Sequence, residues 1–423
     1  MAILESGFSA GGLLHKIVPK ELPGSQQLAI PQAIMGSDRY WMLEAFQESM
    51  KGIGITNPNP AVGCVIIDSN GQEISRGHTQ AYRGLHAERS ALNKLDTITA
   101  SDQLNGATAY VTLEPCSHFG NQPPCVDLFL NSKIRRIVIS CPDPNPIING
   151  EGIRKLQAAG KEVSIGLFSP EVSAWNLPFF ASQKLKRPFI ALKWAQTLDG
   201  QLADDSNTSQ WISGPVSRSY THWLRQKYDA ILVGARTALA DLPSLDVRDC
   251  NPPHQSQPLP ILFDPKGQCL EADTALQARL SERTFHTDRP LVYVTTNAAA
   301  QRRLKDNWIF KRENITPITL HSLKSEEWVP ELLSLLKSSE IEKLLTHPLQ
   351  SVFVEGGPAT LSIFLKSNQV DFIHAFVAPA LSGGLRNRIH LNKLLREKLE
   401  FTPVATSQLG NDVLMELMSP TLK

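Results

Sequence analysis

A histidine and two cysteines in the N-terminal half of the chain are residue types that commonly bind metal ions. His86 begins a His-Ala-Glu triplet, and Cys116 and Cys125 follow it in the sequence. One imidazole and two thiolates supply three ligands for zinc and leave the fourth tetrahedral position for a water molecule. Because a structural zinc site would use four protein ligands, this set predicts a catalytic zinc site that activates water.

Glu88 lies just after His86 and need not bind the metal itself. It could carry a proton from the activated water to a departing nitrogen, as the general acid/base of zinc deaminases does. Each piece alone is commonly structural, since His-x-Glu occurs by chance and paired cysteines often fill a core. Their combination favours zinc, because all of them are expected at one end of one sheet. His118 could replace a cysteine as a ligand, but we favour the two cysteines.

The remaining cysteines are expected to be structural. Cys64 and Cys141 lie within apolar strands and are expected in the core, whereas Cys250 and Cys269 are expected in loops. Only 6 of the 423 residues are Cys, which is far fewer than in a disulfide-stapled secreted domain. The sequence therefore predicts a cytoplasmic protein with reduced thiols.

The composition is that of an ordinary globular protein. The net charge is +1, with 42 Lys and Arg against 41 Asp and Glu, so no basic surface for nucleic acid is expected. The apolar runs are much shorter than the roughly 18 residues of a membrane-spanning helix, so no membrane is expected either. At roughly 150 residues per domain, the length suggests two or three domains. We expect small-molecule partners, and a homo-oligomer is compatible with the sequence.

The region 38–167 alternates helical and extended patterns. Ser37 or Asp38 can cap a helix whose apolar side recurs at spacings of three and four, through Met42, Ala45, Phe46 and Met50. Strands are then expected at 61–68, 108–113, 133–140 and 162–165, and helices at 88–95, after Pro124 and at 152–159. This alternation predicts an α/β domain around a mostly unbroken sheet.

The region 188–423 has a second α/β pattern. Strands are expected at 189–194, 230–233, 260–263, 291–295, 351–354 and 372–377, and helices at 216–227, 328–337 and 359–366. The polar and aromatic segment 168–187 contains an Arg-Pro pair and separates the two patterns. The expected organisation is therefore an extension at 1–37, a first domain at 38–167, a linker at 168–187 and a second domain at 188–423.

Motifs around the predicted zinc ligands indicate a family. Eight residues separate Cys116 from Cys125, whereas the usual deaminase signature has two. Two further motifs are the segments Asn57–Gly63 (NPNPAVG) and Val111–His118 (VTLEPCSH). Together with the cysteine spacing, they resemble the motifs in the deaminase half of the bifunctional riboflavin-biosynthesis enzymes of the RibD family. One departure is Asn121-Gln122, where the family usually has a basic residue and Thr.

The resemblance implies a cytidine-deaminase-like α/β/α domain that binds one Zn²⁺. It implies that 2,5-diamino-6-ribosylamino-4(3H)-pyrimidinone 5′-phosphate exchanges its C2 amino group for oxygen. Asn59 and His78 match family positions near the pyrimidine and are candidates to orient it. Alternatively, Asn59 is a turn residue that caps backbone groups and His78 is a solvent-facing histidine.

The second half resembles the reductase half of the same family. The motifs are Lys193–Gly200 (KWAQTLDG), Ser209–Ser213 (SQWIS), Asp241–Arg248 (DLPSLDVR) and Val354–Pro358 (VEGGP). This resemblance implies a dihydrofolate-reductase-like α/β domain that uses NADPH to convert the ribosyl group to ribityl. It assigns to the cofactor Gln196, Trp211, Thr237, Asp241, Gly357 and Pro358. It assigns to the substrate Ser209, Arg225, Leu245, Arg248 and Glu355.

Elementary chemistry agrees with part of this assignment. Gly356 and Gly357 follow a β-branched strand and open a helix, so their amides could face a cofactor phosphate, although a plain turn is the alternative. Arg225 and Arg248 could clamp the ribose phosphate bidentately, although a lone helical Arg is usually solvated.

The reduction also needs a proton donor. We take Asp199 as the first candidate, with Lys193 and Glu355 as the others. Lys193 and Asp199 flank a strand end, so they could instead pair with each other in a purely structural role.

Two other functions share some of these sequence features. One is a cytidine or tRNA-adenosine deaminase fused to an unrelated oxidoreductase, which the cysteine spacing and the balanced charge disfavour. The other is a scaffold that keeps the fold without activity. The presence of all three zinc ligands and of Glu88 argues against it.

Overall fold

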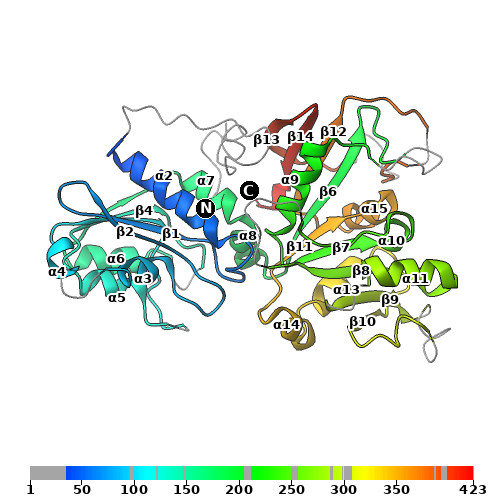
Figure 1. The fold of residues 1–423 in the computed structure, drawn as a ribbon, viewed down its shortest axis with the longest axis horizontal. Helices are drawn as coiled ribbons and strands as arrows, with labels where there is room; N and C mark the ends of the chain where they lie inside the picture. Colours follow the sequence, from blue (N-terminus) through cyan, green and yellow to red (C-terminus); the bar gives the residue numbers. More distant parts are fainter. Residues whose placement is uncertain are drawn as a thin grey trace. The chain divides into compact units, whose positions relative to one another are not determined.

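The computed structural model describes residues 35–95, 100–120, 122–145, 149–203, 211–248, 256–285, 289–297, 299, 307–384, 387–391 and 398–422. The described residues up to Lys186 form one compact unit, and those from Arg187 onward form another. We call them the N-terminal unit and the C-terminal unit (Figure 1).

The N-terminal unit contains one five-stranded sheet with the strand order β2-β1-β3-β4-β5. Its strands are β1 (Gly63–Ile67), β2 (Glu73–His78), β3 (Thr108–Leu113), β4 (Arg136–Cys141) and β5 (Glu162–Ile165). Its helices are α2 (Asp38–Ser49), α3 (Ala87–Leu92), α4 (Ala100–Gln103), α5 (Cys125–Leu130), α6 (Glu151–Ala158), α7 (Ser169–Trp175) and α8 (Leu177–Leu185). Strand β1 is antiparallel to β2 and β3, whereas β3, β4 and β5 are parallel. The sequence pattern missed β2.

Helices cover both faces of this sheet. The expected N-cap Ser37 accepts a hydrogen bond from the Tyr40 amide, and α2 then packs Met42 onto the core beside Val65 and Tyr110. Helix α7 lies on the same side, whereas α3, α5 and α6 lie on the other (Figure 1). The predicted α/β/α architecture is therefore confirmed.

The segment expected to be a linker differs from that expectation. Residues 169–185 form α7 and α8, each with a proline in its first turn, where a missing N–H costs nothing. Between the helices, Asn176 is 6% exposed. Its side chain accepts from the Ala61 amide at 2.8 Å and donates to the Ala61 carbonyl at 3.2 Å. This pairing ties the segment to the N-terminal unit, which composition alone could not indicate.

Replacing Asn176 by Ala is expected to destabilise the N-terminal unit by about 2 kcal/mol, because both polar groups of buried Ala61 lose their partner. Chemical denaturation followed by far-UV circular dichroism measures the change. Unchanged stability would show that the segment is not anchored there.

The C-terminal unit contains a nine-stranded sheet with the order β10-β9-β8-β7-β11-β6-β12-β14-β13. Its strands are β6 (Phe189–Thr197), β7 (Ala230–Gly234), β8 (Leu259–Phe263), β9 (Leu291–Thr296), β10 (Ile315–Leu320), β11 (Ser351–Glu355), β12 (Phe372–Ala378), β13 (Thr402–Leu409) and β14 (Asp412–Met418). Its helices are α9 (Pro215–Arg225), α10 (Ala235–Asp241), α11 (Thr274–Arg283), α13 (Trp328–Leu335), α14 (Ser339–Leu345) and α15 (Pro358–Lys366). The sequence pattern missed β10, β13 and β14, as well as α10, α11 and α14.

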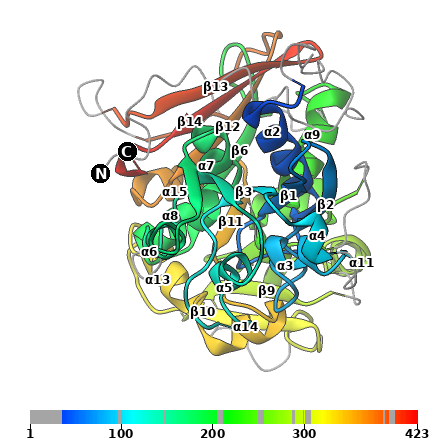
Figure 2. The same cartoon turned by 90° about the vertical axis from the view of Figure 1, so that its left-hand side faces the viewer.

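The first seven strands of this order, from β10 through β11 to β12, are parallel to one another, and β14 and β13 extend the sheet as antiparallel strands. The last two strands lie side by side (Figure 2). Strand β11 lies between β6 and β7, although it follows both of them in the chain. Parallel α/β sheets place their ligand sites at the carboxyl ends of strands around such a change of direction. The ends of β6, β7 and β11 are therefore the expected place for a site.

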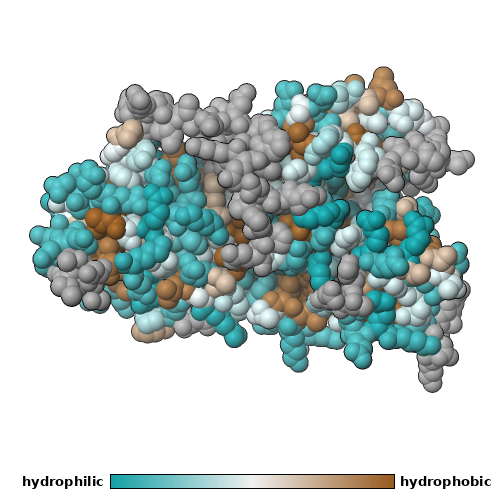
Figure 3. Space-filling view, in the orientation of Figure 1, coloured by the Kyte–Doolittle hydropathy of each residue, from teal (hydrophilic) through white to brown (hydrophobic). Residues whose placement is uncertain are grey.

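Hydrophilic residues dominate the visible surface of both units, and apolar residues form small separate areas (Figure 3). Among the described residues, no helix combines the length and apolar character needed to cross a membrane. Cys64 and Cys141 are buried as expected. The expectation of a loop position was wrong for Cys269, which is buried in a short 3-10 helix, and Cys250 lies outside the described residues.

A candidate zinc site and a candidate reductase site

Two helix starts and one strand end bring the predicted zinc ligands together. His86 is the N-cap residue of α3, and Cys125 is the first residue of α5. Cys116 follows β3, and its thiol accepts a hydrogen bond from the Cys125 amide at 3.2 Å. The Cys116 carbonyl also accepts from the Val126 amide at 3.1 Å. The N-terminus of α5 thus fixes the backbone and the thiol of Cys116.

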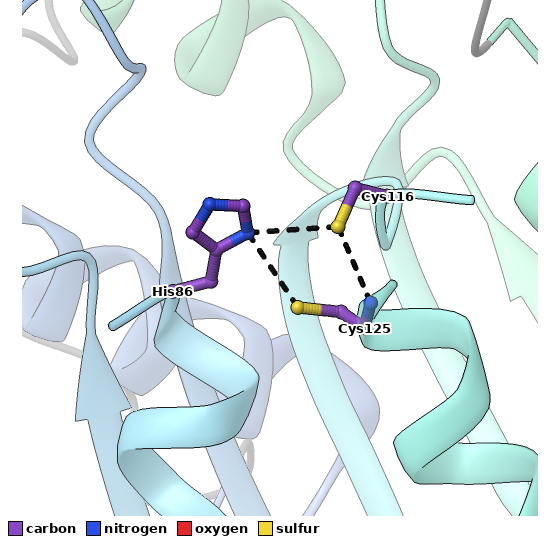
Figure 4. Close-up of side chains that lie close together, drawn as sticks. All are labelled: His86, Cys116 and Cys125. Carbon is purple, nitrogen blue, oxygen red and sulfur yellow. Dashed lines mark hydrogen bonds between the residues drawn. The ribbon is translucent and has the colours of Figure 1, made fainter. Parts of the chain in front are cut away.

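The three ligand atoms face one another (Figure 4). His86 Nδ1 lies 3.6 Å from Cys116 Sγ and 3.5 Å from Cys125 Sγ. All three atoms lie within 4.8 Å of one another, as the ligands of a single ion do. His118 is exposed and does not belong to this group.

The chemistry of the donor set fits zinc with an open coordination position. A hydrogen bond from the Cys125 thiol, together with one from His86, lowers the pKa of Cys116 to about 4. The same bond, together with burial, raises the pKa of Cys125. A cation bound between the two thiols would stabilise both of them as thiolates.

Glu88 lies in the first turn of α3 and is 4% exposed. Burial raises its pKa to about 7, and the negative charge of Cys116 acts in the same direction. The carboxyl group thus lies in a dry environment next to the ligands, as a group that exchanges protons with a metal-activated water requires.

His78 is the last residue of β2, and its ring contacts Glu48, which no sequence motif had indicated. Its Nδ1 lies 2.8 Å from Oε1 of Glu48 on helix α2, and Oε2 of the same carboxylate accepts from Lys51 at 2.6 Å. His78 is therefore a fixed side chain rather than a freely solvated one. Asn59 lies in the turn before β1, where its backbone N–H donates to the Thr56 carbonyl at 2.8 Å.

The Glu48 carboxylate should make the stability of the N-terminal unit depend on pH. Burial acts to raise its pKa, but hydrogen bonds from His78 and Lys51 lower it from 4.5 to about 2. Because the folded pKa is depressed, this stabilisation is full above the unfolded value of 4.5 and is lost as the pH falls toward about 2. The size is on the order of 3 kcal/mol.

We expect Glu48→Gln to lower the free energy of unfolding most at neutral pH, with a gap to the wild type that narrows below pH 4.5. Urea denaturation at a series of pH values measures this gap. Glu44→Gln on the same helix is the control, since Glu44 contacts Arg76 without reaching His78. A gap that is constant with pH would contradict the assignment.

In the C-terminal unit, the turns after β7 and β11 meet at the expected edge of the sheet. The Gly357 amide donates to Thr237 Oγ1 at 3.0 Å, and Pro358 begins α15. A Cβ atom on Gly234 would lie 2.0 Å from Thr360 Oγ1, so only glycine permits this approach. Three of the predicted cofactor residues, Thr237, Gly357 and Pro358, are therefore adjacent.

The other predicted cofactor residues are more scattered. Gln196 Oε1 accepts from Trp194 Nε1 at 2.8 Å on β6. Trp211 is 65% exposed, and the Arg218 guanidinium lies 4.6 Å from its ring centre. Asp241 is the exposed last residue of α10. The predicted substrate residue Ser209 lies outside the described residues.

The predicted substrate residues gather around Arg225. Its guanidinium donates to Glu355 at 2.5 and 3.0 Å, and to the Asp246 carbonyl at 2.6 Å. Arg248 forms an ion pair with the Asp246 side chain, and the buried Leu245 precedes that residue. Arg225 is therefore held by protein groups, and Arg248 is the more exposed of the two guanidinium groups.

The structure does not support Asp199 as the proton donor. Hydrogen bonds from the Thr197 hydroxyl and from the amides of Ser382 and Gly383 lower its pKa to about 2. The carboxylate is thus ionised at neutral pH and holds a turn. Its nearby cation is Arg388 at 3.9 Å rather than Lys193.

Lys193 instead belongs to a row of ionisable residues that run across the sheet. In the strand register, Glu355 and His374 are its neighbours on either side, and Glu416 follows His374 on β14. Burial lowers the pKa of Lys193, which the charge of Glu355 partly opposes. Of this row, the sequence analysis missed His374 and Glu416, since nothing in the local sequence indicates cross-strand register.

Comparisons with known proteins find matches to both units of the chain. The cytidine and deoxycytidylate deaminase zinc-binding region matches residues 35–141, and the RibD C-terminal domain matches residues 188–415. The riboflavin biosynthesis protein RibD of Aquifex aeolicus is 35% identical over 379 residues, which cover 89% of this chain and 97% of that protein. The chain belongs to the RibD family.

Further members give the same result. The RibD protein of Escherichia coli is 32% identical over 90% of this chain and 99% of its own length. The solved structure of a diaminohydroxyphosphoribosylaminopyrimidine deaminase/5-amino-6-(5-phosphoribosylamino)uracil reductase from Thermotoga maritima has a TM-score of 0.73 at 30% identity, covering 90% of this chain and 98% of that one. The RibD structure from Acinetobacter baumannii (form 1) has a TM-score of 0.71 at 30% identity, with the same coverage.

As a member of the RibD family, the chain is a bifunctional deaminase and reductase of riboflavin biosynthesis. Its zinc-binding deaminase domain lies in the N-terminal unit, and its reductase domain lies in the C-terminal unit. The functional class and the fold inferred from the sequence are therefore confirmed.

Proposed function

We propose that the N-terminal unit deaminates 2,5-diamino-6-ribosylamino-4(3H)-pyrimidinone 5′-phosphate at C2. The C-terminal unit then reduces the ribosyl group with NADPH, giving 5-amino-6-(5-phospho-D-ribitylamino)uracil. The observation that carries the first step is the convergence of His86, Cys116 and Cys125 beside a buried Glu88. The Thermotoga maritima relative, which has this pair of activities in its name, supports the second step.

In the deaminase step, His86, Cys116 and Cys125 would hold a zinc ion, which when bound would supply the Lewis-acid chemistry that makes a water molecule acidic. Glu88 takes the proton of that water and delivers it to the departing nitrogen. Asn59 and His78 orient the pyrimidine, and Glu48 fixes the ring of His78 through the contact at Nδ1.

In the reductase step, the cofactor contacts are assigned to Gln196, Trp211, Thr237, Asp241, Gly357 and Pro358. The substrate contacts are assigned to Ser209, Arg225, Leu245, Arg248 and Glu355. Hydride transfer is the chemistry that NADPH supplies. The chain must provide the proton, and Lys193 replaces Asp199 as the proposed donor because it is a half-buried cation beside Glu355 and its pKa is lowered.

The proposed location is the cytoplasm, and the proposed partners are small molecules. The cysteines among the described residues form no disulfide, and the net charge of +1 provides no field for nucleic acid. A homo-oligomer remains compatible with these observations.

The test is incubation of the purified protein with the diaminopyrimidinone phosphate, with the product followed by mass spectrometry. Exchange of an amino group for oxygen adds about one mass unit, and reduction adds about two more only when NADPH is supplied. A gain of two units on the unreacted substrate, without prior deamination, would contradict the proposed order. No change in mass under either condition would contradict the proposed substrate.

A further inference from the structure

Residues 245–248 of the C-terminal unit belong to no helix or strand, and we call them the 245–248 segment. Leu245 is 1% exposed, and its backbone φ of 51° lies in the left-handed region that favours glycine. A leucine keeps this conformation only where the surrounding structure holds it. Contacts from the rest of the C-terminal unit are therefore expected to fix the segment.

Two side chains that follow the segment in the sequence bind its backbone. The Arg289 guanidinium donates to the Leu245 carbonyl from both Nη1 and Nη2, each at 3.3 Å. The side-chain amide of Gln257 accepts from the Val247 N–H at 2.7 Å and donates to the Val247 carbonyl at 2.9 Å. The first and third residues of the segment are thus held in place.

Helix α9 supplies the partners of the other two residues. Arg225 Nη1 donates to the Asp246 carbonyl at 2.6 Å. The backbone N–H of Arg248 donates to His222 Nδ1 at 3.4 Å. His222 and Arg225 both lie in the last turn of the helix. Every residue of the segment therefore has a backbone group bound by a side chain from outside it.

Arg225 also joins the segment to the carboxyl edge of the sheet. The same guanidinium donates to both carboxylate oxygens of Glu355, at 2.5 and 3.0 Å. Glu355 is the last residue of β11, which lies between β6 and β7. Parallel α/β sheets bind ligands beyond the carboxyl ends of strands at such a change of direction. The contacts thus place the segment at the edge where a ligand site is expected.

The hydrogen bonds of His222 determine which ring nitrogen carries the proton. Arg225 Nη1 lies 3.2 Å from His222 Nδ1, the atom that also accepts from the Arg248 N–H. A guanidinium has only donors, and a backbone N–H is a donor as well. His222 Nδ1 must therefore have a lone pair, which leaves the ring proton on Nε2.

The charges around His222 favour this neutral ring. Burial lowers the pKa of His222 to about 4, and the positive charges of Arg225 and Arg248 act in the same direction. The carboxylates of Glu355 and Asp246 oppose this shift without cancelling it. The imidazole is thus neutral at pH 7, as its two donors require.

We propose that His222 is a positioning residue for the reduction. As a neutral imidazole, it ties the backbone of Arg248 to the guanidinium of Arg225. It thereby holds the 245–248 segment in the conformation that binds the phosphate end of the pyrimidine substrate. His222 acts through Nδ1 and gives no proton to the reacting atoms. This inference rests on the proposed reductase function, in which Arg225, Leu245 and Arg248 contact the substrate.

The test compares two substitutions of His222 in the full-length protein. His222→Leu removes the acceptor, whereas His222→Asn places a carbonyl oxygen close to the former position of Nδ1. In His222→Leu, we expect KM for the deaminated pyrimidine to rise about tenfold, because two donors lose their shared acceptor. KM for NADPH should stay within about twofold and kcat within about threefold of the wild type. His222→Asn should keep KM for the pyrimidine within about threefold.

Two controls accompany these variants. Ammonia release should stay at the wild-type rate in both, because the deaminase domain lies in the N-terminal unit. His321→Leu, at an exposed position after β10, should leave KM for the pyrimidine unchanged. An equal rise of this KM in His222→Leu and His222→Asn would overturn the proposal, and so would an unchanged KM in His222→Leu.

A wild-type measurement covers the case in which His222→Leu fails to fold. Nitrogen-15 NMR of the His222 ring at pH 6 should show a proton on Nε2 and none on Nδ1, although an ordinary histidine is mostly charged at this pH. An imidazolium, or a proton on Nδ1, would overturn the inference. If the wild type did not reduce the deaminated pyrimidine, the proposed function would fail, while the NMR spectrum would still test the state of His222.

Discussion

Ammonia release is expected to fall by about a thousandfold when Glu88 is replaced by Gln, which is the range for loss of a general acid/base. Glutamine has nearly the same shape and accepts one hydrogen bond, but it cannot take up a proton. The zinc content should remain that of the wild type, because Glu88 is not among the three ligand residues. Coupled detection of ammonia with the diaminopyrimidinone phosphate measures the rate, and metal analysis measures the zinc.

Reduction serves as the internal control for this variant. When the deaminated pyrimidine is supplied directly, Glu88→Gln should oxidise NADPH at the wild-type rate, since Glu88 belongs to the N-terminal unit and the reductase domain to the C-terminal unit. Ammonia release at more than a tenth of the wild-type rate would remove Glu88 from its proposed role.

Arg225→Met is expected to abolish NADPH-dependent reduction and to destabilise the C-terminal unit by about 3 kcal/mol. The Arg225 and Glu355 side chains are only 10% and 14% exposed. Removal of the guanidinium leaves Glu355 as a buried charge beside Lys193, without the bidentate partner that now satisfies it. Urea denaturation and NADPH oxidation measure the two effects.

The double variant Arg225→Met/Glu355→Gln separates charge from packing. With both charges removed, no unpaired carboxylate remains, so the double variant should be less destabilised than the sum of the two single variants. Arg248→Met is the control for stability, because the Arg248 side chain is 43% exposed and its loss should cost less than about 1 kcal/mol. If the loss of stability in the double variant equalled the sum of the two single losses, Arg225 and Glu355 would not stabilise each other.

The zinc site could be predicted because its evidence is local. The motifs around His86 and Cys116 each lie at a helix start or a strand end, and the chemistry of imidazole and thiolate narrows the metal to zinc. The periodic segments were also predictable, as for α2, where Ser37 caps the helix and the apolar spacing holds.

The supporting residues could not be predicted, because their partners are distant in sequence. Glu114 accepts hydrogen bonds from backbone amides such as those of Asp143 and Ile153. Glu48 on helix α2 contacts His78 at the end of strand β2. Asn176, in a segment that composition suggested was a linker, pairs with Ala61. Each of these roles depends on the packing of the sheet and not on any local pattern.

The reductase residues were harder to assign for a similar reason. Asp199 has the residue type of a proton donor, but three hydrogen bonds in a turn keep it ionised. The row from Glu355 through Lys193 to His374 follows from parallel register alone. The sequence contains these residues without indicating that they are neighbours.

The central claim is that His86, Cys116 and Cys125 hold one zinc ion and leave its fourth position open. Zinc X-ray absorption of the purified protein tests it directly. The account predicts one zinc per chain, with two sulfur neighbours at about 2.3 Å and two nitrogen or oxygen neighbours at about 2.0 Å. A zinc ion with a different number of sulfur neighbours, or a fully active protein without zinc, would contradict it.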